Sequence, residues 1–255
     1  MLRAFSTAAT GMTGQQMVVD TIANNLANIN TNGFKKSQID FQDLMYVKLQ
    51  EADETVPNGF EIGSGVRAAG TLKVFTLGEM ETTNRPLDVA IQGDGFFVVT
   101  GPDKSYYTRD GSLRVDSQGR LCTSSGLPIE PAITIPSDSR SITINTDGTV
   151  SVFQGSSDSP SNVGVISIVR FANPSGLTSE GRNLYSETPA SGPAISGTAG
   201  EGGFGTIQQN LLEKSNVQMV TELVNLITAQ RAYEINSRAI RAGDEMLTTT
   251  TRLIS

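Results

Sequence analysis

The chain has 255 residues, which is enough for one large domain or for two smaller ones. Its formal net charge is −7, so the broad basic surface of a general nucleic-acid binder is not expected. Histidine is absent and Cys122 is the single cysteine, which excludes His-dependent catalysis and leaves too few ligands for a zinc site. We therefore expect no metal and no other cofactor.

The first part of the chain has the pattern of an amphipathic helix. Apolar residues recur at every seventh position, and they are Phe5, Met12, Val19 and Leu26. This spacing is typical of a helix that packs against another helix in a coiled-coil-like manner. Polar residues and glycines interrupt the segment, so it lacks the continuous apolar run of a secretory signal. A cytoplasmic location, or export by a route that cleaves no signal, follows as the expectation.

Several asparagines end this predicted helix. Asn32-Gly33 is a dipeptide that commonly stops a helix in a turn. Asn25 and Asn28 come earlier, within the otherwise apolar pattern. Because a side-chain amide both donates and accepts hydrogen bonds, these two residues could either satisfy polar groups at a tight interface or face solvent.

The middle of the chain has the pattern of a β-rich body. Short runs of β-branched and aromatic residues between about 66 and 187 are separated by turn dipeptides such as Asp110-Gly111 and Asp147-Gly148. Such a pattern predicts a sandwich or barrel-like body. The segment 46–65 before it is acidic and ends rich in glycine. We interpret it either as a disordered linker or as a hairpin-like arm that reaches a neighbouring molecule.

The C-terminal part predicts a second, longer helix. An apolar residue recurs every seven positions, and the series is Leu212, Met219, Leu226, Tyr233, Ile240, Leu247 and Ile254. A helix over 211–254 would exceed the roughly 25 residues that are usual in globular proteins. In the later part of this helix the positions beside the apolar series become polar. A single chain could therefore not bury the apolar side of the helix well. We therefore predict an assembly helix, in which Leu226, Tyr233, Ile240 and Leu247 pack with Phe5, Met12, Val19 and Leu26.

No constellation in the sequence indicates an enzyme. Gly93-Asp94-Gly95 lacks the third glycine of a dinucleotide-binding loop and is followed by a strand pattern, so it is interpreted as a turn. Asp110, Asp116 and Asp147 stand in hairpin-turn contexts, where aspartate is common for local hydrogen-bonding reasons. Catalytic, cofactor-binding and metal-binding residues are accordingly not predicted.

Two motifs at the ends of the chain carry a family resemblance. The segment 24–35, NNLANINTNGFK, closely resembles the N-terminal signature of bacterial flagellar basal-body rod and hook proteins. The segment 222–237, ELVNLITAQRAYEINS, is similar to the matching C-terminal motif. Within this family, segments 87–97 and 107–112 most resemble those of distal rod subunits. The resemblance covers nearly the whole chain.

The resemblance implies an α+β fold in three parts. Residues 1–36 and 211–255 would form terminal helices that pair as an inner assembly domain, and 66–210 would form a β-rich outer body. Residues 37–65 would connect them and carry the arm. The family also implies a structural subunit of the flagellar distal rod, which polymerises helically into a hollow shaft and transmits motor torque to the hook.

The same resemblance implies the partners and the location. The chain would contact itself, proximal rod subunits and hook or hook-junction subunits, with bushing rings of the cell wall and outer membrane as further neighbours. It would lie in the flagellar basal body and would bind no nucleic acid. The alternatives are a proximal rod or hook subunit of the same family and, from another class, a β-rich surface binding module.

Overall fold

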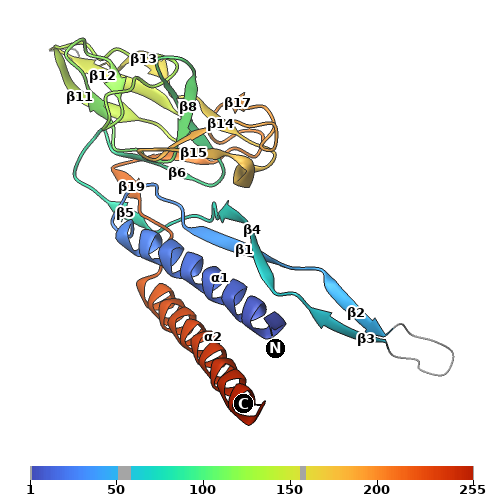
Figure 1. Ribbon diagram of the computed structural model, residues 1–255. Coiled ribbons are helices and arrows are strands. Elements are labelled where there is room, and N and C mark those ends of the chain that lie inside the picture. Colours follow the sequence, from blue (N-terminus) through green and yellow to red (C-terminus); the bar gives the residue numbers. More distant parts are fainter. Residues whose placement is uncertain (1, 51–58, 156–158, 255) are drawn as a thin grey trace. The chain divides into compact units, whose positions relative to one another are not determined.

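The computed structural model describes residues 2–50, 59–155 and 159–254 (Figure 1). The chain divides into two compact units. The helical unit contains residues 1–27, 37–73 and 218–255, and the β unit contains residues 28–36 and 74–217. The backbone therefore passes from one unit to the other four times, after residues 27, 36, 73 and 217.

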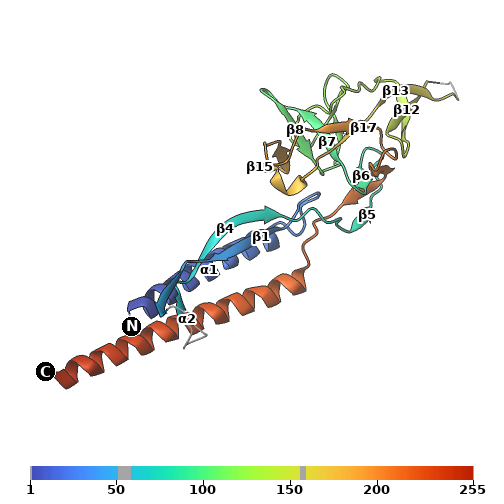
Figure 2. The same ribbon diagram turned by 90° about the vertical axis from the view of Figure 1, so that its right-hand side faces the viewer.

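The helical unit consists of a helix pair and a long β-ribbon (Figures 1 and 2). Its elements are α1 (Leu2–Ala27), β1 (Ser37–Asp43), β2 (Tyr46–Gln50), β3 (Phe60–Gly63), β4 (Val66–Lys73) and α2 (Met219–Ile254). β1 pairs antiparallel with β4, and β2 pairs antiparallel with β3. The prediction of paired terminal helices is confirmed. The hairpin within 46–65 is confirmed over β2 and β3, its reach to a neighbouring molecule stays a prediction, and residues 51–58 lie outside the described residues.

The β unit holds the remaining strands. They are β5 (Met80–Thr82), β6 (Val89–Gln92), β7 (Phe96–Thr100), β8 (Ser105–Thr108), β9 (Arg114–Val115), β10 (Leu121–Cys122), β11 (Ser139–Ile144), β12 (Thr149–Gln154), β13 (Ser161–Val165), β14 (Ile168–Arg170), β15 (Thr178–Gly181), β16 (Leu184–Ser186), β17 (Ile195–Gly197), β18 (Thr206–Gln209) and β19 (Leu211–Glu213). The largest sheet of the described residues has the order β15-β16-β8-β7-β14-β17, and a smaller one has the order β11-β12-β13. The prediction of a β-rich middle is confirmed.

β7 shows why this unit has a core on both faces of its main sheet. Its apolar run Phe96-Phe97-Val98-Val99 is buried throughout. Successive side chains of a strand point to opposite faces. Phe97 and Val99 accordingly join one hydrophobic cluster, whereas Phe96 and Val98 join another. A continuous apolar run thus forms a strand that is covered on both sides.

The second of these clusters gives a pH-dependent prediction. Tyr107 packs edge-on against Phe171, and burial, reinforced by the nearby Glu187 carboxylate, raises the pKa of Tyr107 to about 12. An unfolded tyrosine ionises near its ordinary pKa of about 10. Between these two values the unfolded chain releases the proton first, so rising pH favours unfolding. Denaturation at pH 9 and pH 11.5 should show a larger loss of stability for the natural chain than for Tyr107→Phe; equal losses would contradict the assignment.

The boundaries of the two units differ from the sequence-based expectation. α2 begins at Met219, not near residue 211, because Leu211–Glu213 forms β19 and pairs with β5. Leu212 fits the seven-residue series but is a buried strand residue. Residues 28–36 likewise belong to the β unit, and β4 belongs to the helical unit because it pairs with β1.

Candidate functional site

The two terminal helices run antiparallel within the helical unit and approach each other closely at small residues. A Cβ atom on Gly11 would lie 3.0 Å from the Asn236 side chain, and one on Gly243 would lie 2.8 Å from the Phe5 ring. Ala229 is 3% exposed. The tight contacts therefore lie on the heptad of Glu222, Ala229, Asn236 and Gly243, which alternates polar and small residues and so gives little hydropathy signal.

Of the residues predicted to form the helix seam, Phe5 takes part in this contact directly, and the others are not among its most deeply buried members. Those that are half-buried are Phe5, Met12, Val19, Leu26, Leu226, Ile240 and Leu247. Tyr233 is 43% exposed. An α-helix rotates by about 20° less than two full turns over seven residues, so a strict seven-residue series drifts across the helix surface. The series therefore overlaps this contact at Phe5 without marking the residues that are most deeply buried.

Asn25 satisfies polar backbone groups at a buried contact, which is one of the two alternatives that the sequence left open, but its partner was not predicted. It is 2% exposed, and its side-chain amide donates to the Ser37 carbonyl and accepts from the Ser37 N–H, both at 2.9 Å. It thus binds the first residue of β1 in the way that a paired strand would. Asn28 is half-buried and accepts a hydrogen bond from the Thr31 hydroxyl at 3.2 Å in the turn after α1.

An apolar patch on the N-terminal half of α2 is left uncovered in the helical unit. It consists of Met219, Val220, Leu223, Val224 and Ile227, which we call the α2 patch. Each of these side chains is at least 40% exposed, and Val220 is 76% exposed. The spacing of one, four, five and eight residues from Met219 places them on one face, and Glu222 and Ala229 are buried on the other. Continuous apolar surface of this kind marks an interaction site.

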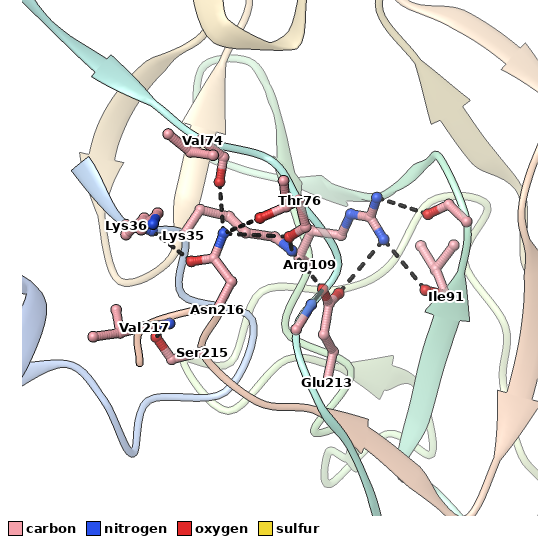
Figure 3. Close-up of polar contacts among 12 residues, drawn as sticks. Lys35, Lys36, Val74, Thr76, Ile91, Arg109, Glu213, Ser215, Asn216 and Val217 are labelled. Carbon is pink, nitrogen blue, oxygen red and sulfur yellow. Dashed lines mark hydrogen bonds and ion pairs between the residues drawn. The ribbon is translucent and has the colours of Figure 1, made fainter. Parts of the chain in front are cut away.

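A buried ion cluster of Lys35, Arg109 and Glu213 lies in the β unit (Figure 3). The side chains of Lys35 and Glu213 are fully buried and form an ion pair through Nζ and Oε1. The guanidinium of Arg109 lies 3.5 Å from the other carboxylate oxygen of Glu213. Burial lowers the pKa of Lys35, and the Glu213 carboxylate opposes this by favouring the charged ammonium. One carboxylate therefore serves two buried cations that come from distant parts of the chain.

Backbone groups complete this cluster. The Lys35 ammonium donates to the Thr76 carbonyl at 2.7 Å, and the Gly78 N–H donates to Glu213 Oε1 at 2.9 Å. Arg109 Nη2 donates to the Gly93 carbonyl at 2.8 Å. The cluster thus joins segment 28–36, segment 74–78 and the end of β19.

Asn216 forms a second tie between the same segments. Its carbonyl oxygen accepts from the Lys36 N–H at 2.8 Å, and its Nδ2 donates to the Val74 carbonyl at 2.8 Å and to the Thr76 hydroxyl at 2.9 Å (Figure 3). The Val74 N–H donates in turn to the Lys36 carbonyl at 3.0 Å. Sequence reasoning missed both ties, because their members lie far apart in the chain.

The aspartates considered for catalysis are used in turns. Asp110 accepts from the Ser112 N–H at 3.0 Å, Asp116 from the Gln118 N–H at 2.8 Å, and Asp147 from the Thr149 N–H at 2.9 Å. The interpretation of these residues as turn formers is confirmed. Among the described residues, no cluster of three acidic or cysteine side chains has the arrangement of a metal site. In the same residues, neither terminal helix is apolar enough over a sufficient length to cross a bilayer.

Comparisons with known proteins match both ends and the middle of the chain. Family models described as flagella basal body rod protein, flagellar hook protein FlgE/F/G D1 domain, and flagellar basal body rod FlgEFG protein C-terminal match residues 5–35, 90–152 and 208–253. The first match spans most of α1 and its turn, and the third spans the end of β18, all of β19 and nearly all of α2. The matched segments therefore include both terminal helices and the Lys35 and Glu213 sides of the ion cluster.

Whole-chain relatives give the same result. The chain is 48% identical to the flagellar basal-body rod protein FlgG of Borreliella burgdorferi over 97% of both chains. It is 42% identical to FlgG of Caulobacter vibrioides over 100% of both chains. It is also 34% identical to the flagellar hook-basal body complex protein FlhP of Bacillus subtilis over 97% of both chains. The chain belongs to the family of flagellar basal-body rod proteins.

Proposed function

We propose that this chain is a structural subunit of the flagellar distal rod, which polymerises helically into the hollow shaft that carries motor torque to the hook. Full-length similarity to two FlgG proteins supports this function. The observation that carries it is the α2 patch, because the helical unit leaves this apolar face uncovered. Repeating one non-closing interface between identical chains produces an open helical polymer.

Within this function, the helical unit forms the inner assembly domain and the β unit forms the outer body. The proposed assembly residues are Phe5, Met12, Val19, Leu26, Asn25, Asn28, Leu226, Tyr233, Ile240 and Leu247, to which we add the α2 patch. Burying apolar surface contributes roughly 25 cal/mol per Å². A polymer that covers the α2 patch on every subunit would thus gain free energy that the single chain cannot obtain.

The proposed neighbours are further copies of the chain, proximal rod subunits, and hook or hook-junction subunits, with bushing rings around the shaft. The proposed place of action is the basal body in the cell envelope, reached without cleavage of a signal peptide. The role is structural and not enzymatic, and it requires no nucleic acid. The similarity to proteins named for the basal-body rod and for the hook-basal body complex supports this setting.

A second candidate is another subunit of the same hook-basal body complex. The chain is 34% identical to FlhP over 97% of both chains, against 48% for FlgG of Borreliella burgdorferi, and this weaker full-length similarity supports the second candidate. The two candidates differ in where the polymer stops when the subunit is missing.

Electron cryotomography of basal bodies from a strain that lacks this chain tests the proposal. A distal rod subunit predicts short proximal rods without hook or filament, and expression of the natural chain should restore full-length structures. Complete rods with normal hooks in the deletion strain would refute the distal-rod function. A full rod without a hook would favour the second candidate.

A further inference from the structure

The ion cluster connects residues that lie far apart in the sequence. Lys35 and Glu213 are 178 residues apart, and Arg109 lies between them in sequence. Lys35 follows the first helix, whereas Glu213 precedes the second helix by only a few residues. A chain that has not yet brought its C-terminal link into place therefore has the two cations of the cluster without their shared carboxylate.

Removing one partner from a buried ion pair is strongly destabilising, since the remaining charge has lost its compensation in a poorly solvated site. Here the loss of Glu213 would leave two cations, one of which has no exposed side-chain surface and the other 3%. The Nε–H of Arg109 already has no hydrogen-bond partner among the described residues. Without Glu213 the two cations would keep only the neutral backbone carbonyls of Thr76, Ile91 and Gly93 as partners, and no negative charge would balance them.

We propose that the Lys35–Arg109–Glu213 cluster makes stable folding of the whole β unit, here called closure, conditional on docking of the C-terminal link, residues 211–217. A chain whose link is missing or undocked would then have no stably folded β unit. The cluster then controls the stability of the whole β unit, and not only that of the neighbouring segments 28–36 and 74–82. Its consequence for assembly, that incomplete chains are kept out of the polymer, rests on the proposed function. The conditional closure itself does not.

Hydrogen exchange of the full-length chain measures this directly. In Glu213→Gln, amides of β6, β7 and β12 should exchange at least about 100-fold faster than in the natural chain, together with amides of segments 28–36 and 74–82. The matched control is Glu180→Gln, which removes the carboxylate of the exposed ion pair with Lys104 in the same unit. This control should stay within about threefold of the natural chain, as exposed pairs contribute little.

Two outcomes would overturn the proposal. Faster exchange confined to 28–36 and 74–82, with β7 and β12 unchanged, would show that the cluster stabilises only the neighbouring segments. An equal acceleration in Glu180→Gln would show that the effect is not specific to the buried carboxylate.

A double variant keeps the test informative if Glu213→Gln does not fold. Lys35→Met/Glu213→Gln removes one buried cation together with the carboxylate, and Arg109 keeps its contacts with the Ile91 and Gly93 carbonyls. Recovery of at least about tenfold slower exchange in β7 would support the charge-based condition. No recovery would overturn it, because the loss would then come from something other than uncompensated charge. Since exchange is measured on the monomer, this result is independent of whether the chain forms a rod.

Discussion

Val224→Asp should abolish polymerisation while the monomer stays folded. Val224 is 56% exposed in the helical unit and lies in the middle of the α2 patch, so aspartate is tolerated in the single chain. In a polymer that covers the patch, the same carboxylate would be buried without a partner, at a cost of several kcal/mol. A cost of about 3 kcal/mol raises the concentration needed for assembly by more than 100-fold. Sedimentation and electron microscopy of purified chains measure assembly, and circular dichroism reports helix content.

The matched control is Thr221→Asp. It places the same charge three residues away in the first turn of α2, where Thr221 is exposed and outside the α2 patch. This variant should polymerise like the natural chain. Polymers of normal length from Val224→Asp would contradict the role of the patch. Leu226→Asp is a less direct test, because Leu226 is half-buried in the helical unit and its replacement would also disturb the monomer.

Gly33→Ala should destabilise the β unit by more than 3 kcal/mol. Gly33 has a φ of +67°, and its N–H donates to the Glu213 carbonyl at 2.8 Å. A Cβ atom there would lie 2.6 Å from the Arg109 carbonyl carbon and from the Asp110 nitrogen. Both are backbone atoms, so the clash cannot be relieved by rotating a side chain. The left-handed conformation alone costs about 1–2 kcal/mol for a non-glycine residue, and the clash adds to this.

Gly126→Ala separates these two contributions. Gly126 has a φ of +82° but no neighbouring atom within 4 Å of a built Cβ atom. It should therefore show the conformational cost of about 1 kcal/mol without the clash. Urea denaturation of the two full-length variants, monitored by circular dichroism, gives the loss of unfolding free energy for each. Equal losses for the two variants would show that Gly33 is required only for its backbone conformation and not for the close approach to Arg109.

The sequence predicted the helices well and their limits less well. The seven-residue spacing of Phe5, Met12, Val19 and Leu26 indicated α1, which ends at Ala27, and the turn predicted at Asn32-Gly33 is present with Gly33 in a left-handed conformation. Leu212 was misassigned because a strand residue can match a helical spacing by chance. What holds it in β19 is pairing with β5, a contact between segments about 130 residues apart that local periodicity does not encode.

The ion cluster shows the same limit for the functional site. Lys35 was recognised as part of an N-terminal signature, whereas Arg109 and Glu213 gave no signal of being its partners. Charged residues are usually solvent-exposed, so burial of all three depends on long-range packing. Asn25 is a milder case, because the sequence correctly marked it as unusual within α1 but offered no indication that Ser37 would be its partner.

The four passages of the backbone between the two units have a mechanical consequence. A domain attached by one linker receives any applied load through a single peptide segment. Here the load would be divided among four segments, and Asn216 bonds directly to Lys36, Val74 and Thr76 beside three of the passages. Cleavage of one passage would leave the other three intact. In an assembly under load, such parallel attachment would keep the two units connected after damage that would detach a singly linked domain.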